Sequence, residues 1–181
     1  SDFTDFGDVV VVAASGTTGA GRSAKINLIA SEVSGSLTSY KFGGVHQHIP
    51  EIEETLAEIS GQNVKVSFTP ILAPMPRGIL STITIKLIKE ISLADVRKIY
   101  QDYYQESPFV RLLPGGQMPK TAAVIGSNFA QIQVAIDEHT SRLVVSIAID
   151  NLGKGAAAQA LHNANLIAGF EPTAGLLGDG L

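Results

Sequence analysis

Four consecutive valines followed by two alanines, at residues 9–14, are the strongest structural signal in this chain of 181 residues. β-branched side chains favour strands, and an uninterrupted apolar run is typical of a strand buried on both faces. Asp8 precedes the run and a glycine-rich loop follows it. We therefore expect a strand inside a sheet, with both of its faces covered.

The remaining patterns predict a sheet with several helices. Further strands are expected at residues 37–42, 64–69, 78–88, 131–137 and 142–150, the third of these preceded by a proline-rich turn at 70–76. Helices are expected at residues 23–32, from Pro50 onward, from Ser92 onward and at residues 154–168. Residues 138–141 have the length of a hairpin loop. Because strands and helices do not alternate strictly, we expect a single α+β domain over residues 1–181, with a mixed, largely antiparallel sheet and helices on one face.

Composition excludes several classes of function. With 45% hydrophobic and 17% charged residues, the chain is apolar enough to form a packed core. The net charge is −4 and no run of lysine or arginine is present, so we expect neither nucleic acid nor a membrane as partner. The N-terminus lacks the pattern of a secretory signal, so a cytoplasmic location is expected. The absence of cysteine excludes disulfides, thiolate metal ligands and a cysteine nucleophile within this sequence.

The glycine loop after the first strand is one candidate for ligand binding. Residues 16–23 nearly match the phosphate-binding pattern G-x-x-x-x-G-K-[ST], with Arg22 in place of the lysine. A nucleotide-hydrolysing loop needs that lysine, so a P-loop protein is a minor alternative. Glycines also allow a ligand to approach the backbone, and Arg22 could contact an anion there. An ordinary tight connection remains the competing interpretation.

His46 and His48, one residue apart, form the second candidate site. Alternate residues of an extended chain share a face, so the two rings could bind a metal, but no second pair of ligands follows, and we expect no metal. An acid/base role agrees better with the sequence, because imidazole titrates near neutral pH and Gly43 and Gly44 would let a substrate approach. Two exposed loop histidines with no function are the alternative.

Two more turns carry polar residues that could contact a ligand. Arg77 follows the proline-rich turn at the start of a strand, where a guanidinium could bind a carboxylate or phosphate through two hydrogen bonds. Residues 150–155 end a strand and open an alanine-rich helix with two glycines. Either pattern is also common on an ordinary protein surface.

Taken in order, five segments resemble one family. They are VVVVAASGTTGAGRSAK, YKFGGVHQHIPEIEETL, VSFTPILAPMPRGILSTI, PGGQMPKTAAVIGSN and AIDNLGKGAAAQALHNANLIAGFEPTAGL. They closely resemble the C-terminal half of bacterial N-acetyl-gamma-glutamyl-phosphate reductases, whose architecture is similar to that of aspartate-semialdehyde dehydrogenases. The resemblance covers essentially the whole chain and implies the catalytic and dimerisation domain, with a fold like the C-terminal domain of glyceraldehyde-3-phosphate dehydrogenase.

The resemblance also implies an activity. The family reduces N-acetyl-glutamyl phosphate to the semialdehyde in arginine biosynthesis: a cysteine attacks the acyl phosphate, phosphate leaves, and NADPH delivers hydride. By resemblance His46 is the acid/base residue and His48 supports the substrate pocket. Ser15 and Gly16 would lie at the cofactor, and Asn151 and Lys154 beside the nicotinamide. Contacts of Arg22 and Arg77 with the anionic substrate are our own inference.

Two departures from the family pattern qualify this expectation. Gln47 stands between the histidines where the family commonly has arginine. The family's cysteine segment and its NADP-binding Rossmann domain precede the part that this chain resembles, so the chain alone is expected to be inactive, and residues 150–181 are expected to pack toward that missing domain. The implied partners are the acyl-phosphate substrate and further copies of the chain, in a homodimer or homotetramer. A folded assembly module without catalysis is the alternative.

Overall fold

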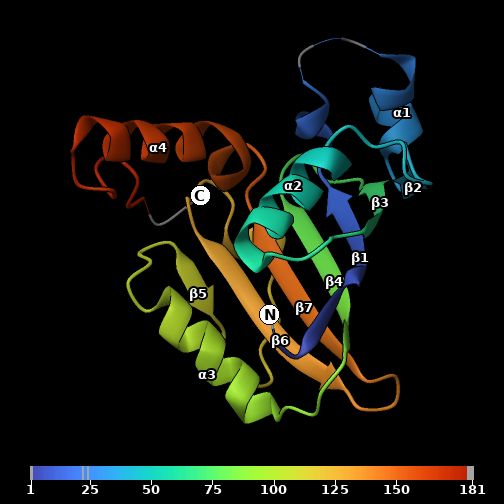
Figure 1. Cartoon of the computed structure of the whole chain (residues 1–181). Helices are drawn as coiled ribbons and strands as arrows, with labels where there is room; N and C mark the ends of the chain where they lie inside the picture. The colour runs from blue at the N-terminus through green and yellow to red at the C-terminus, as the bar shows by residue number, and fades with distance from the viewer. Residues whose placement is uncertain (1, 22, 24, 179–181) are drawn as a thin grey trace.

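The computed structural model describes residues 2–21, 23 and 25–178, and its strands form one sheet (Figure 1). The seven strands are β1 (Thr4–Ser15), β2 (Thr38–Ser39), β3 (Val66–Leu72), β4 (Ile79–Leu87), β5 (Val110–Leu112), β6 (Ala130–Asp137) and β7 (Arg142–Ile149). Their order across the sheet is β2-β3-β1-β4-β7-β6-β5, and the pairs β1/β3 and β5/β6 are parallel while the other four are antiparallel. The predicted mixed, largely antiparallel sheet is confirmed.

The helices are α1 (Ala30–Val33), α2 (Ile49–Ser60), α3 (Leu93–Tyr104) and α4 (Ala158–Ala168). Ser92 caps α3 as predicted, because its Oγ accepts a hydrogen bond from the backbone N–H of Asp95 at 3.1 Å. The predicted helix at 23–32 is wrong in its length: a short 3-10 turn and the single turn of α1 lie there. Ile26, 84% exposed, has no core to pack against, so nothing stabilises a longer helix. None of the helices formed by the described residues is long and apolar enough to cross a membrane.

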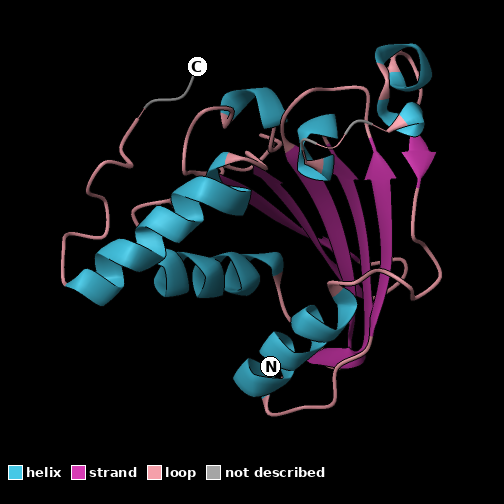
Figure 2. Cartoon of the chain, turned by 90° about the horizontal axis from the view of Figure 1, so that it is seen from above, coloured by secondary structure: helices cyan, strands magenta, loops and turns pink. Residues whose placement is uncertain are grey.

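The long helices lie on one side of the sheet, as predicted (Figure 2). Helix α2 packs on Val9, Val11 and Val66, and α3 packs through Val96 on β6 and β7. Ile83 of β4 contacts both groups, so the two helices share one face and one continuous core. This packing orients the start of α2, where the histidines lie, against β3.

The other side of the sheet is less covered than the valine run predicted. Strand β1 lies between β3 and β4. Its residues Val9 and Val11 are 2% and 9% exposed, but its residue Val12 is 38% exposed. The expectation that both faces of β1 are buried is therefore wrong for this chain, because its helices cover one face only. We call the other side the open face. Its central residues are Val10, Val12, Leu80, Thr82, Thr84, Val144 and Ser146.

Several boundaries differ from prediction. The strand expected at residues 37–42 is reduced to the two residues of β2, and no strand was predicted at β5. Strand β3 continues through Pro70 to Leu72 instead of ending at residue 69. The carbonyl of Pro70 accepts from the N–H of Tyr40, so this residue directs its backbone toward the short β2 and its missing N–H costs no bond to β1. The predicted helix at 154–168 begins as a wide π-type turn at Gly153–Ala157 before α4.

Candidate active site

His46 lies in the segment between β2 and α2 and is only 9% exposed. Its ring centroid is 4.8 Å from that of Phe68 on β3, 5.9 Å from that of Tyr40 and 5.0 Å from that of His48. Apolar and aromatic contacts therefore fix the orientation of the ring, as an acid/base residue requires. We call residues 40–48 the histidine segment.

The hydrogen bonding of His46 indicates where its proton resides. The backbone N–H of His48 donates to Nδ1 of His46 at 3.3 Å, so a neutral ring carries its proton on Nε2. Burial lowers the pKa of His46, and the charges of His48 and Lys41 lower it further. Near neutral pH the ring is therefore uncharged, and its Nε2–H can donate a hydrogen bond.

His48 is exposed beside His46, with the two rings edge to face. This pair does not extend into a metal site: among the described residues, no three histidine, aspartate or glutamate side chains converge on one point. The two rings therefore lie side by side just before α2, one buried and one exposed.

A second group of polar residues gathers where β1 and β7 end and β4 begins. Asp150 is completely buried there, and both of its oxygens accept hydrogen bonds from the guanidinium of Arg77. The backbone N–H groups of Gly126 and Leu152 donate to the same carboxylate at 2.6 and 2.9 Å. Burial raises the pKa of Asp150, but these backbone bonds and Arg77 outweigh it and hold the pKa below its usual range. Asp150 is thus a carboxylate that the fold itself satisfies.

Asn151 connects this carboxylate to the glycine loop. Its Oδ1 accepts from the N–H of Gly78 at 2.7 Å, and its Nδ2 donates to Oγ1 of Thr18 at 2.9 Å. The N–H of Gly16 donates to the carbonyl of Gly78 at 2.8 Å. We call this set the strand-end network. Its members are Gly16, Thr18, Arg77, Gly78, Asp150 and Asn151.

The residues predicted from the sequence thus separate into two groups. Ser15, Gly16, Arg77 and Asn151 meet at the strand ends, whereas His46 and His48 lie in the histidine segment. Arg22 lies outside the described residues.

Sequence reasoning gave no role to Asp150 or Thr18. An aspartate at the end of a predicted strand, followed by Asn-x-Gly, was the available signal. The partner of Asp150, Arg77, is 73 residues away in the sequence, so their contact is not visible in any local pattern.

Lys154 lies in the wide turn that precedes α4. Its ammonium is 5.3 Å from the ring centroid of Phe109, and burial lowers its pKa. A Cβ at Gly153 would lie 2.6 Å from the carbonyl oxygen of Ser127, so only glycine allows the turn to approach that backbone. The turn thereby holds Lys154 half-buried beside an aromatic ring.

Backbone N–H groups of the glycine loop are already used in hydrogen bonds to the proline-rich turn. The backbone N–H of Thr17 donates to the carbonyl of Met75 at 2.9 Å, and that of Thr18 donates to the carbonyl of Pro76 at 3.2 Å. A P-loop keeps such N–H groups free to surround phosphates. These bonds therefore disfavour the nucleotide-binding alternative.

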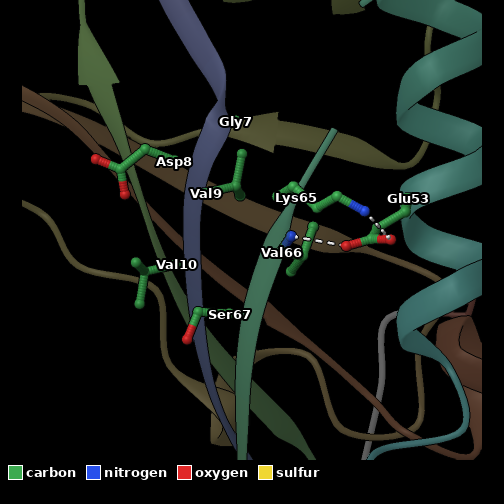
Figure 3. A pocket seen from close by; sticks show the side chains of 8 residues that line it. All are labelled: Gly7, Asp8, Val9, Val10, Glu53, Lys65, Val66 and Ser67. Atoms are coloured by element: carbon green, nitrogen blue, oxygen red, sulfur yellow. Dashed lines mark hydrogen bonds and ion pairs between the residues drawn. The ribbon is translucent and has the colours of Figure 1, made fainter. Parts of the chain in front are cut away.

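A hollow of about 260 Å³ between β1, β3 and α2 does not belong to the candidate site (Figure 3). Glu53 at its wall accepts from the N–H of Val66 at 3.0 Å and pairs with the ammonium of Lys65 at 3.8 Å (Figure 3). Its carboxylate is therefore used in joining α2 to β3. None of the residues that line this hollow belongs to the histidine segment or the strand-end network.

Comparisons with known proteins agree with the fold and the sequence resemblance. The sequence model of the family described as semialdehyde dehydrogenase, dimerisation domain, matches residues 1–151. An N-acetyl-gamma-glutamyl-phosphate reductase from Acidothermus cellulolyticus is 55% identical over 96% of this chain and 51% of that protein. One from an Arthrobacter species is 54% identical over 93% of this chain and 49% of that protein. The chain thus spans about half the length of these relatives.

Solved structures show the same fold at low identity. The crystal structure of aspartate semialdehyde dehydrogenase II from Vibrio cholerae complexed with ASA matches with a TM-score of 0.72 at 17% identity. The match covers 92% of this chain and 56% of that one.

Proposed function

Because the chain belongs to the semialdehyde dehydrogenase dimerisation-domain family, we propose that it is the substrate-binding and dimerisation part of an N-acetyl-gamma-glutamyl-phosphate reductase. In the proposed reaction the acyl phosphate and NADPH give the semialdehyde, phosphate and NADP. The relatives that carry this name at 54–55% identity support the choice of substrate. The rest of such an enzyme supplies the cysteine nucleophile.

The observation that carries the proposal is the state of His46. A buried, uncharged imidazole with Nδ1 bonded to the backbone presents an Nε2 proton in a fixed direction. A negative charge develops on the carbonyl oxygen of the substrate when hydride adds to its carbon, and a hydrogen bond from this Nε2–H stabilises that oxyanion. A base role toward the thiol needs an unprotonated nitrogen facing the substrate, so we propose oxyanion stabilisation as the role of this tautomer and the base role as that of the other tautomer.

The residues expected at the cofactor fit a supporting role. Asn151 and Gly16 use their polar groups within the strand-end network, and the hydroxyl of Ser15 donates to the carbonyl of Gly16 at 3.3 Å. The half-buried ammonium of Lys154 and the accepting side of the Ser15 hydroxyl are therefore the groups that we propose to contact NADP. NADPH supplies the hydride when bound. We propose that most of its contacts come from the part of the protein outside this chain.

We further propose that a second copy of the chain covers the open face. Strand β1 carries valines on both of its faces, yet Val12 is 38% exposed in the single chain. The central residues of the open face are also uncharged, as in a surface that binds another protein. The matching family is described as a dimerisation domain, which supports a second copy of the chain as the partner that covers this face. Val12→Lys should convert the full-length dimer into monomers in analytical ultracentrifugation, whereas Val12→Thr should not. A dimer that survives the lysine would exclude this face.

Residues 150–181, of which 179–181 lie outside the described residues, are proposed to contact the remaining half of the protein. Leu166, Ile167 and Phe170 at the end of α4 are 55%, 89% and 66% exposed, which is unusual for apolar side chains near each other. Ile167→Asp should therefore lower the melting temperature of the full-length protein. An unchanged melting temperature would leave this helix end as a solvent-exposed surface.

The reductase proposal is tested with the full-length protein. Oxidation of NADPH should depend on N-acetyl-glutamyl phosphate, and His46→Ala should lower kcat by roughly 10²–10⁴-fold, as loss of acid/base catalysis does. His139→Ala in the exposed β6/β7 hairpin is the matched control and should leave kcat unchanged. No turnover of the acyl phosphate by the wild-type protein would reject the function, and near-normal turnover by His46→Ala would reject the role of His46.

A further inference from the structure

Lys41 has an unusual backbone conformation for its position. Among the described residues, the non-glycine residues with positive φ are Lys41, at 43°, and Ser141, at 51°. Ser141 ends the loop of the β6/β7 hairpin, where such a conformation is common. Lys41 belongs instead to the histidine segment, five residues before His46. Strained backbone that surrounding structure maintains is concentrated at binding and catalytic sites.

The conformation of Lys41 is part of a tight curl. Gly43 and Gly44 follow with φ of 81° and 83°, values that glycine adopts at little cost. Through this curl the chain returns on itself, and the ammonium of Lys41 donates to Oε1 of Gln47 at 3.2 Å. The amide of Gln47, the residue between the two histidines, therefore binds the ammonium.

The position and charge of Lys41 suit an anion. Its ammonium is bonded to the side chain of Gln47, the residue next to His46, and its charge contributes to lowering the pKa of His46. None of the ion pairs formed between described residues includes Lys41, and its bond to Gln47 is to a neutral acceptor. The positive charge is thus not neutralised by the fold. Arg77, in contrast, is paired with Asp150.

We propose that Lys41 binds an anionic group of the substrate next to His46, and that Gln47 positions its ammonium. This inference rests on the proposed function, in which the substrate carries a carboxylate and a phosphoryl group. It also gives a role to Gln47, which replaces a charged residue between the histidines: the cation comes from Lys41 and the amide directs it. Arg77 then needs no contact with the substrate and stabilises the fold through its ion pair with Asp150.

The experiment uses the full-length protein in the reverse direction, with semialdehyde, inorganic phosphate and NADP. Lys41→Asn is the informative variant, because asparagine tolerates positive φ and removes the charge. KM for one of the two anionic reactants should rise by about 10–100-fold, the usual value of a charge-assisted contact, with kcat within a few-fold of normal. A rise for phosphate assigns Lys41 to the phosphoryl group, and a rise for the semialdehyde assigns it to the carboxylate.

Two further variants separate binding from structure. Lys41→Arg should restore most of the lost affinity, and Lys89→Met, which removes an exposed lysine between β4 and α3, should leave both KM values unchanged. If the wild-type protein is active and Lys41→Asn changes neither KM, the role of Lys41 is wrong while the proposed function stands. If the wild-type protein does not catalyse the reaction in either direction, both are wrong.

Discussion

The strand-end network and the histidine segment contain similar polar residues but differ in how completely the fold satisfies them. Asp150 is fully buried and accepts bonds from Arg77, Gly126 and Leu152. His46 has one long hydrogen bond, and Lys41 has one bond to a neutral amide at a strained backbone position. Groups that the protein saturates hold the chain together, whereas groups that it leaves partly unsatisfied are available to a ligand. The comparison predicts that substitutions in the first region mainly change stability and those in the second mainly change turnover or substrate affinity.

The largest effect on stability is expected from Asp150→Ala. It leaves the guanidinium of Arg77 and two backbone N–H groups without their acceptor, and breaking such a buried pair costs about 3–5 kcal/mol. Urea unfolding of the full-length protein measures the loss. Adding Arg77→Met to Asp150→Ala should recover part of the stability, since it removes the uncompensated charge. If Asp150→Ala reduces turnover while leaving the unfolding free energy unchanged, the network is part of the active site.

A smaller loss is expected from Gly16→Ala. A Cβ at Gly16 would lie 2.9 Å from the backbone N of Arg77, too close for ordinary contact, although φ at Gly16 is −66° and suits any residue. Backbone displacement of this kind costs about 1–3 kcal/mol. Gly115→Ala is the matched control, because a Cβ there meets no atom within 4 Å. Equal unfolding free energies for the two variants would mean that the glycine loop can move away from Arg77.

The sequence predicted those features that depend on residues close together in the chain. The strands β1, β3, β4, β6 and β7, the hairpin at residues 138–141 and the Ser92 cap of α3 follow from local patterns and are present. Strand β2 is shorter than predicted, and the three-residue β5 was not predicted. The exposure of Val12 was not predictable in this way, because a continuous apolar run does not reveal whether a helix or a second copy covers the strand. Helix 23–32 failed for a related reason: its apolar residues have no core within reach.

The candidate sites show the same limit. The histidine pair was recognisable as a motif, but the pairing of Arg77 with Asp150 joins residues 73 positions apart and changes the expected use of that arginine. The positive φ of Lys41 has no local signature, since lysine disfavours it and neighbouring contacts impose it. Long-range pairing and imposed strain are therefore what the structure adds to the sequence.

The smallest expected effect is the pH dependence that His46 gives to stability. Burial, His48 and Lys41 lower its pKa below the ordinary 6.5, so the unfolded chain binds this proton more readily than the folded one. Stability should be fully present above pH 6.5 and should fall as the pH decreases through that value toward the folded pKa, by no more than about 1.4 kcal/mol per pH unit for one proton. His162, whose pKa is lowered by burial and by Lys154, acts in the same direction. Urea unfolding at several pH values should therefore show a reduced slope in His46→Gln and a further reduction in His46→Gln/His162→Gln. A slope that His46→Gln leaves unchanged would mean that the histidine segment holds its ring less firmly in the neutral form than the contacts with Phe68 and His48 imply.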